Sequence, residues 1–253
     1  MKPIIKGKIG KNCQIGEGVI IDKDVVIGDN CIIEPYAVIT GYTEIGDNNH
    51  IFSHAVIGSI PQDLKYHGEK TKLIIGNNNK IREFTLINPG TENGGGVTKI
   101  GDNNLLMGYV HVAHDVIIGN NCILANAATL AGHVVLEDYV VIGGMTPIHQ
   151  FVKIGEHAMI AGASAVSQDI PPYCLAEGNR AKLRGLNLTG LRRRLEDRTI
   201  IDEIKRAYKE LFESGKPLRD VAKELLKSEN PYVKHLAEFV LNSKRGIPYV
   251  RKV

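Results

Sequence analysis

The sequence predicts a mainly β protein: a parallel β-helix of hexapeptide repeats, followed by a C-terminal α-helical domain. Three observations lead to this prediction. Aliphatic residues recur at every sixth position from Ile9 to Val166, with two interruptions. Glycine, asparagine and aspartate gather between them. From about residue 188, apolar residues instead follow one another at helical spacing. We therefore expect a β-helix domain over residues 1–180 and a helical domain over residues 181–253.

The six-residue period fits neither an α-helix nor a flat strand, whose periods are about 3.6 and 2. It fits a helix of short strands, in which three six-residue sides make one coil of 18 residues. Residues 18 apart then stack on successive coils, about 4.8 Å from one another. The aliphatic position is held in successive repeats by Ile9, Ile15, Ile21, Ile27, Ile33, Ile39, Ile45, Ile51 and Ile57, and later by Leu106, Val112, Ile118, Leu124 and Leu130.

The corners of such a coil require residues that can turn. Glycine often follows the aliphatic residue, as at Gly10 and Gly119, and asparagine and aspartate crowd the same segments. Glycine adopts positive φ readily, and asparagine and aspartate tolerate it. We therefore expect each corner to need residues that are small or permissive in φ.

Two polar segments interrupt the rhythm, at residues 59–73 and 88–98, and we expect both to loop out of the prism. Loops on a rigid scaffold are favoured places for ligand contacts. Pro171 and Pro172 should close the β region, because consecutive prolines cannot continue a ladder. Three or four helices should follow, with apolar faces in the segments 188–195, 200–212, 218–225 and 233–240.

Composition bounds the compartment and the partners. The sequence has no apolar run long enough for a signal peptide or a membrane span, so we expect a cytoplasmic protein. Cys13, Cys31 and Cys122 fall at a small-residue position of the repeat, which predicts reduced core residues and not disulfides or metal ligands.

The net charge of +3 is unevenly distributed along the chain. Residues 180–253 hold 19 Lys and Arg against 10 Asp and Glu, a net +9, whereas residues 1–179 are net −6. A basic end predicts an acidic partner. Nucleic acid is disfavoured because aromatic stacking platforms are missing.

The stretch from residue 108 to 133 contains the strongest candidate site. The 18-residue coil places Gly132 over His114, His133 over Asp115 and Gln150 over Gly132. One edge of the prism then presents an imidazole, whose pKa suits a general base near neutrality, beside a backbone position without a side chain. Whether Asp115 orients His114 stays open, because adjacent strand residues point apart.

Several strings sharpen this interpretation: QDLKY at 62–66, NNLLMGYVHVAHD at 103–115, NCILANAATLAGH at 121–133, IGGMTPIHQF at 142–151 and DIPPY at 169–173. Together they resemble the UDP-N-acetylglucosamine 3-O-acyltransferases of lipid A biosynthesis, a hexapeptide-repeat family. The resemblance implies a left-handed β-helix and a homotrimer with active sites between neighbouring prisms. It also implies transfer of an (R)-3-hydroxyacyl group from the phosphopantetheine of acyl carrier protein to the sugar 3-hydroxyl, without a metal or further cofactor.

The same resemblance assigns roles to individual residues. His114 matches the general base, and Gly132 matches the residue whose N–H meets the developing oxyanion. Gly162 matches the position that limits the acyl chain, so a glycine there implies a long donor. The remaining matches are substrate-binding residues: Asp63, Lys65, His111, His133, His149 and Gln150 in the cleft, and Asn187, Arg193 and Arg194 at the nucleotide and its phosphates.

Alternatives remain at this stage. Asn88-Pro89 replaces the His-Arg of better-known members, and Thr189 replaces a common acid, so a sugar with a 3-amine is an alternative acceptor. A histidine metal site of the carbonic anhydrase kind is a rival. The other rivals are the later N-acyltransferase of the same pathway and a non-catalytic scaffold.

Overall fold

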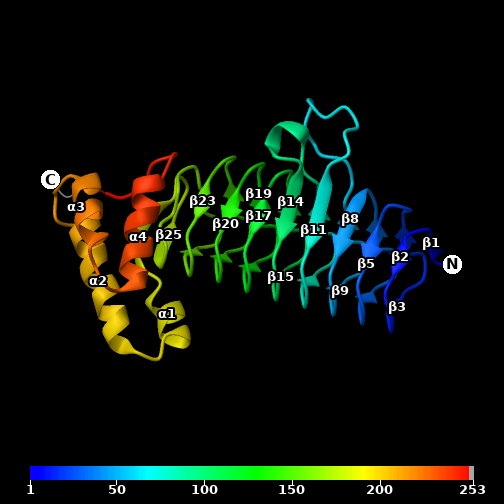
Figure 1. Cartoon of the computed structure of the whole chain (residues 1–253), viewed down its shortest axis with the longest axis horizontal. Helices are drawn as coiled ribbons and strands as arrows, with labels where there is room; N and C mark the ends of the chain where they lie inside the picture. Colours follow the sequence, from blue (N-terminus) through cyan, green and yellow to red (C-terminus); the bar gives the residue numbers. More distant parts are fainter. Residues whose placement is uncertain (251–253) are drawn as a thin grey trace.

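The computed structural model describes residues 1–250, and Figure 1 shows them as a long prism of short strands with helices packed at one end. Each turn of the prism passes through three parallel sheets, here called A, B and C. The predicted β-helix is thereby confirmed. Among the described residues, no helix is both long and apolar enough to cross a membrane.

Sheet A contains β1 (Ile4–Ile5), β4 (Ile20–Ile21), β7 (Val38–Ile39), β10 (Val56–Ile57), β13 (Leu86–Ile87), β16 (His111–Val112), β19 (Thr129–Leu130) and β22 (Pro147–Ile148). Sheet B contains β2 (Lys8–Ile9), β5 (Val26–Ile27), β8 (Tyr42–Ile45), β11 (Lys72–Ile75), β14 (Val97–Ile100), β17 (Ile117–Ile118), β20 (Val135–Leu136) and β23 (Lys153–Ile154). Sheet C contains β3 (Gln14–Ile15), β6 (Ile32–Ile33), β9 (His50–Ile51), β12 (Lys80–Ile81), β15 (Leu105–Leu106), β18 (Ile123–Leu124), β21 (Val141–Ile142), β24 (Met159–Ile160), β25 (Cys174–Glu177) and β26 (Lys182–Leu186).

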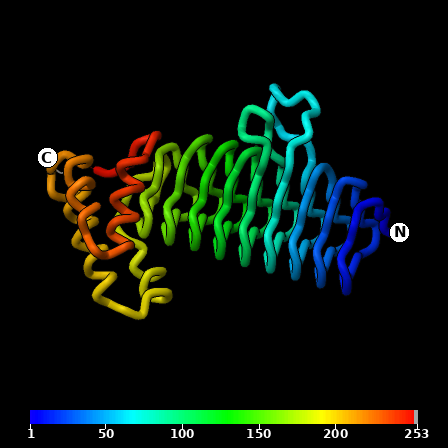
Figure 2. The backbone as a smooth tube through the Cα atoms, viewed as in Figure 1, coloured from blue at the N-terminus to red at the C-terminus, as the bar shows by residue number. Residues whose placement is uncertain are grey.

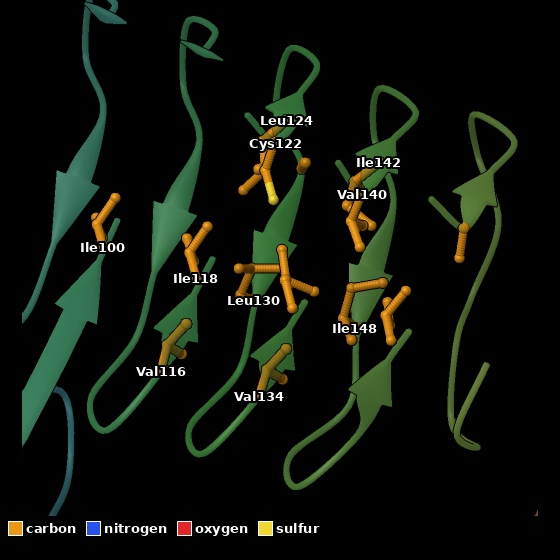
Figure 3. Packing of buried hydrophobic residues seen from close by; sticks show 14 of the residues in the cluster. Ile100, Val116, Ile118, Cys122, Leu124, Leu130, Val134, Val140, Ile142 and Ile148 are labelled. Atoms are coloured by element: carbon orange, nitrogen blue, oxygen red, sulfur yellow. The ribbon is translucent and has the colours of Figure 1, made fainter. Parts of the chain in front are cut away.

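The 18-residue repeat sets the pairing register. His111 of β16 pairs with Thr129 of β19, and Ile123 of β18 pairs with Val141 of β21. The second residue of each short strand is the aliphatic repeat residue, and it points into the prism. Figure 3 shows Leu124, Leu130, Ile142 and Ile148 meeting there, with the Cys122 thiol among them. The four cysteines are free thiols, as predicted for Cys13, Cys31 and Cys122, and burial raises the pKa of Cys122 to about 12.

The corners turn at the third residue after the aliphatic position, where φ is positive even without glycine. Examples are Asn30, Tyr36 and Asn121, whose φ values lie between 57° and 65°. The N–H of most such residues donates to a carbonyl of the preceding coil, as Asn30 N does to Lys11 O at 2.8 Å. The ladder therefore offsets a cost of about 1–2 kcal/mol per left-handed residue.

Of the two predicted reasons for the corner glycines, small size is the one that the structure confirms. Gly10, Gly101 and Gly119 do not have positive φ. A Cβ on Gly101 would instead lie 2.6 Å from the carbonyl oxygen of Gly119 in the next coil. These positions need glycine because the stacked coils leave no space for a side chain.

Two insertions leave the prism at the corner between sheets A and B, as Figure 2 shows. The first insertion is residues 58–71, between β10 and β11, and the second is residues 88–96, between β13 and β14. The second contains the short 3₁₀ helix η1 (Glu92–Gly94). Both predicted excursions are confirmed, although β11 and β14 begin slightly earlier than expected.

The β region does not close at Pro171 and Pro172 as predicted. Both prolines lie in a corner outside the strands, so β25 still pairs with β24, and β26 pairs antiparallel with β25. Four helices follow, in agreement with the predicted segments: α1 (Leu188–Arg194), α2 (Arg198–Phe212), α3 (Leu218–Leu225) and α4 (Pro231–Asn242).

A charged cluster joins α4 to the prism. His235 of α4 lies between two glutamates of the prism, with Nε2 2.9 Å from Glu137 Oε2 and Nδ1 3.4 Å from Glu156 Oε2. Lys153 Nζ lies 2.8 Å from the other oxygen of Glu137. The hydrogen bond to Glu137, and then that to Glu156, raises the pKa of His235 to about 9. Burial alone would raise the pKa of Glu137, but hydrogen bonds from His235 and Lys153 lower it to about 2.

This cluster makes a prediction about pH and stability. Because the pKa of His235 rises from 6.5 to about 9 on folding, its contribution is complete below pH 6.5 and is lost as the pH rises through about 9. The contribution of the Glu137 carboxylate to stability is complete above pH 4.5 and is lost as the pH falls towards about 2. We expect the urea midpoint of the native protein to fall between pH 6.5 and 9.5. His235→Gln should flatten that fall, whereas the exposed control His67→Gln should keep it. An unchanged profile in His235→Gln would contradict the prediction.

Candidate active site

The predicted stack at the corner between sheets A and B is confirmed. Gly132 lies directly over the imidazole of His114, so that a Cβ on Gly132 would lie 2.5 Å from Cε1 and 2.7 Å from Nε2. This position requires glycine because the imidazole itself occupies the space of a side chain.

Asp115 orients His114, which settles the question left open by the sequence. The two residues lie in a turn and not in a strand, and Asp115 has a φ of 59°. This left-handed conformation brings the carboxylate beside the imidazole, with His114 Nδ1 2.8 Å from Asp115 Oδ2. Both side chains are buried. An ionised carboxylate at Nδ1 fixes the tautomer with its proton on Nδ1 and leaves Nε2 free to accept a proton.

The second insertion supplies residues that the sequence analysis missed. Thr91 donates its backbone N–H to Asp115 Oδ1 at 2.9 Å and its hydroxyl to Asp115 Oδ2 at 2.6 Å. Asp115 in turn donates its N–H to Thr98 Oγ1 at 2.8 Å. No 18-residue spacing relates Thr91 to Asp115, because the insertion shifts the register between them. The repeat pattern therefore gave no signal for this contact.

His133 lies over Asp115, as the 18-residue repeat predicted. Its Nδ1 is 4.0 Å from Asp115 Oδ2, and its ring meets that of His114 edge-on with centroids 5.1 Å apart. On its other side His133 stacks on Phe151, with ring centroids 4.3 Å apart. Burial lowers the pKa of His133, and burial also lowers that of His111 on the outer face of β16. Both rings are thereby biased towards the neutral form near pH 7.

Within residues 1–250, only the carbonyl group of the Gly132 backbone is hydrogen-bonded. Its carbonyl accepts a hydrogen bond from Phe151 N at 3.1 Å. Its N–H, by contrast, has no acceptor among residues 1–250. A free backbone N–H beside an oriented imidazole is the arrangement that stabilises a tetrahedral oxyanion in acyl transfer.

His114, Asp115 and His133 also satisfy the geometry of a metal site, since one ligand atom from each lies within 4.8 Å of the others. The Asp115 carboxylate, however, already accepts two hydrogen bonds from Thr91 and one from His114. A cation would have to displace these contacts. The hydrogen-bonding pattern therefore favours an oriented base over a metal centre.

Asp63 and Lys65 lie in the first insertion, at the same corner as His114. Asp63 is close enough to His133 to raise that residue's pKa slightly against the effect of burial. His149 and Gln150 are exposed one coil beyond Gly132, and His149 Nδ1 contacts its neighbour's carbonyl at 3.2 Å. The structure thus gathers eight of the predicted residues on one edge: His114, Gly132, His133, Gln150, His149, Asp63, Lys65 and, on the adjoining sheet, His111.

The other predicted residues lie elsewhere on the chain. Gly162 is exposed at the corner between sheets C and A. Asn187 caps α1, accepting from Gly190 N at 3.1 Å and donating to His157 O at 3.0 Å. Arg194 places its guanidinium over the Tyr139 ring, 4.5 Å from the centroid, at the corner between sheets B and C, and Arg193 is exposed. A single chain does not bring these residues to His114.

Comparisons with known proteins identify the family. A model described as bacterial transferase hexapeptide (six repeats) matches residues 6–41 and 98–132, and one described as UDP N-acetylglucosamine O-acyltransferase, domain 2, matches residues 169–248. An acyl-[acyl-carrier-protein]–UDP-N-acetylglucosamine O-acyltransferase from Nautilia profundicola is 84% identical over 253 residues, covering 100% of this chain and 98% of the relative. The chain belongs to the UDP-N-acetylglucosamine O-acyltransferase family.

Solved structures agree with this assignment. A UDP-N-acetylglucosamine acyltransferase from Campylobacter jejuni superposes on the acyltransferase chain with a TM-score of 0.95 at 51% identity, covering 99% of this chain and 98% of that one. The enzyme from Francisella novicida gives 0.92 at 36% identity, covering 97% and 91%. The predicted fold class, a left-handed parallel β-helix with C-terminal helices, is confirmed, and so is the prediction that the protein is an enzyme that transfers acyl groups.

Gly132 provides the first test of this site. Gly132→Ala places a methyl group against the imidazole, so His114 must move and kcat should fall by roughly 10²-fold or more. Gly108→Ala is the matched control, because Gly108 holds the same hexad position at another corner and a Cβ there meets its nearest neighbour only at 3.3 Å. Steady-state kinetics should separate the two variants. Equal activity in both would remove Gly132 from the site.

Proposed function

We propose that this acyltransferase moves an (R)-3-hydroxyacyl group from acyl carrier protein to the 3-hydroxyl of UDP-N-acetylglucosamine, the first step of lipid A biosynthesis, in the cytoplasm. One observation supports the chemistry above all others: the His114–Asp115 pair lies directly beneath Gly132, whose N–H has no acceptor among residues 1–250. The names of close relatives supply the donor and acceptor. Four free thiols fit a reducing compartment.

The reaction follows from this geometry. Nε2 of His114 takes the proton from the sugar hydroxyl as the oxygen attacks the thioester carbonyl, while Asp115 stabilises the imidazolium that forms. The carbonyl oxygen becomes an oxyanion, which accepts the N–H of Gly132. Collapse of the tetrahedral intermediate breaks the C–S bond, and the imidazolium returns its proton to the phosphopantetheine sulfur. The products are the sugar ester and the free thiol of the carrier protein.

Substrate roles follow the positions of the remaining residues. Asp63 and Lys65, on the first insertion beside His133, are proposed to contact the sugar nucleotide with His111, His149 and Gln150. Asn187, Arg193 and Arg194 are proposed at the nucleotide, with Arg193 the freer guanidinium because Arg194 lies on Tyr139. An exposed glycine at 162 leaves room for a long acyl tail. No cofactor beyond the donor's phosphopantetheine enters the scheme.

A homotrimer is proposed because the predicted site is divided in a single chain. His111 lies on sheet A and His114 at its corner with sheet B, whereas Gly162 and α1 flank sheet C at its two corners. If sheet A of one protomer faces sheet C of the next, His114 lies in a cleft whose other wall carries a neighbour's Gly162 at one edge and its α1 at the other. Closed threefold symmetry would give three such clefts.

The outer surfaces of the sheets support this packing. Sheets A and C present many aliphatic residues outward, namely Ile20, Val38, Val56 and Leu86 on sheet A and Ile32, Leu105, Ile123 and Val141 on sheet C. Sheet B presents aliphatic residues as well, such as Val26 and Ile117, but intersperses them with charged residues, namely Lys8, Glu44, Lys72, Lys99 and Lys153. Sheet B is therefore the side that suits solvent.

An aromatic ladder lies at the corner between sheets C and A. Tyr36, His54, Phe84 and Tyr109 stack on successive coils, with ring centroids 5.3, 5.2 and 5.0 Å apart. Tyr109 is 62% exposed in the single chain. A contiguous apolar patch of this kind is typical of an interface, and a threefold axis beside this corner would cover it.

The ladder gives a prediction about assembly. Phe84→Asp with Tyr109→Asp should split the trimer into monomers, because three copies would bring like charges together at the axis. Light scattering measures the change, and activity should fall with the trimer fraction. Val26→Asp, a matched change on the exposed face of sheet B, should leave a trimer. An active monomer of the double variant would contradict the shared site.

The general base has its own test. His114→Ala should lower kcat by roughly 10²–10⁴-fold while the trimer stays folded. Chelators should leave the native enzyme active, since the proposed chemistry uses no metal. Near-normal turnover in a folded His114→Ala trimer would refute the assignment, and loss of activity with chelators would restore the metal site.

The same assay decides the acceptor. UDP-N-acetylglucosamine and its 3-amino analogue are supplied side by side to the native enzyme. Asn88 departs from the pattern of better-known members. It is buried, and its side chain donates to the carbonyls of Ser59 and Ile60, so its role is to hold the base of the first insertion. We expect the 3-hydroxyl sugar to be used. A preference for the amine would replace O-acylation by N-acylation in the proposed function.

A further inference from the structure

The hydroxyl of Thr91 and the imidazole of His114 share one oxygen of Asp115. Thr91 Oγ1 lies 2.6 Å from Oδ2, and His114 Nδ1 lies 2.8 Å from the same atom. The second oxygen, Oδ1, accepts the backbone N–H of Thr91 at 2.9 Å. Thr91 is only 6% exposed and Asp115 only 5%. With both oxygens engaged by one residue, the plane of the carboxylate is fixed, and with it the direction in which Asp115 holds the imidazole.

The segment that carries Thr91 is tightly seated over the carboxylate. Gly94 has no side chain at the point where a Cβ would overlap the carboxylate of Asp115. Gly90 N donates to Lys72 O at 3.1 Å, and Lys72 N donates to Gly96 O at 2.8 Å, so both ends of the insertion are bonded to β11. The position of Thr91 is therefore determined by the fold and not by chance contact of a surface loop.

The second insertion is also bonded to the first. The Asn88 amide donates to Ser59 O at 3.0 Å and to Ile60 O at 3.1 Å. These carbonyls lie at the base of the loop that holds Asp63 and Lys65. One nine-residue segment thus contacts both the loop proposed to bind the acceptor and the carboxylate proposed to orient the base.

We propose that Thr91 is a positioning residue of the acyl transfer, whose hydroxyl fixes Asp115 so that His114 presents Nε2 to the acceptor hydroxyl. The inference rests on the proposed role of His114 as general base. Thr91 itself does not touch the reacting atoms. Its hydroxyl acts on the rate through Asp115, and the acceptor's affinity depends on other groups.

Thr91→Val tests the hydroxyl, because valine keeps the shape and the backbone N–H and removes only the Oγ1 donor. Loss of one hydrogen bond to a buried carboxylate should lower kcat by roughly 10- to 100-fold, with KM for the sugar nucleotide within about twofold. Thr91→Ser restores the hydroxyl and should recover most of the rate. Thr85→Val is the matched control, since Thr85 is also fully buried and bonds the Met107 carbonyl at another corner.

The pH profile separates positioning from a general structural effect. A carboxylate that has lost the Thr91 donor attracts the imidazolium more strongly, so the acid limb of kcat/KM should move to higher pH in Thr91→Val. The other ionisable groups near this point are His133, at 4.0 Å from Asp115, His111, which interacts electrostatically with His114, and Asp63 beyond His133. All three are unchanged in the variant. A variant that merely loosened the loop would lose stability without this shift.

Three results would overturn the inference: native kcat in Thr91→Val, a loss confined to KM, or equal impairment in Thr91→Ser.

Should Thr91→Val fail to fold by circular dichroism, Thr91→Ala takes its place with the same expectations. In an Asp115→Asn background, the Thr91 change should cause no further loss of kcat, and an additive loss would contradict the coupling. His114→Ala is assayed in parallel: if it retains activity, the base assignment fails, whereas an inactive His114→Ala with a native Thr91→Val refutes the Thr91 inference alone.

Discussion

The parallel ladder between successive coils is the constraint on which the rest of the structure depends. It stacks residues 18 apart, so that each position of a coil has one neighbour above and one below. Aliphatic residues fill the inside of every coil, and the left-handed corner residues are bonded back to the preceding coil. The same bond that ties His133 N to His114 O at 3.1 Å also sets Gly132 over the imidazole. The candidate site is thus a variation on the ordinary corner and needs no special backbone.

The residues of the candidate site lie where the chain departs from this regular pattern. At the other corners the left-handed residue is often an asparagine or an exposed aromatic residue, whose side chain takes no part in the candidate site. At residue 115 the left-handed residue is an aspartate, and its carboxylate turns back onto the preceding histidine. The second insertion then covers this pair and uses both carboxylate oxygens. The repeated coils position the residues of the candidate site, while the two insertions bury them and supply hydrogen bonds.

The helical end is attached to the prism by charge as well as by packing. His235 lies between Glu137 and Glu156, and Asp169 accepts Ser243 Oγ at 2.7 Å together with the N–H groups of Lys244 and Arg245 at 3.1 Å. Arg194 on Tyr139 adds a third contact. These contacts hold α1 at the corner between sheets B and C.

The sequence by itself determined the coil, its register and the central part of the site. A strict six-residue period in aliphatic residues has one structural solution, so the stacking of Gly132 on His114 and of His133 over Asp115 followed from counting by 18. The four helices followed from apolar spacing for the same reason. Motif resemblance added the family, which the comparisons confirmed.

Only the tertiary structure decided the contacts that do not obey the repeat. The carboxylate of Asp115 reaches His114 because a positive φ at a corner reverses the alternation expected of a strand. Thr91 reaches Asp115 because an insertion folds back across the prism, and the sequence distance between them is not a multiple of the coil. The corner glycines were expected to be small or permissive in φ, and the close approach of successive coils shows that small size is what several of them supply. Gly162 likewise falls at another corner than His114, because it lies two-thirds of a coil beyond a position stacked on His114, and Arg193 lies on α1. Periodicity fixes which residues stack, whereas the direction of each side chain and the path of each insertion depend on the local backbone and its hydrogen bonds.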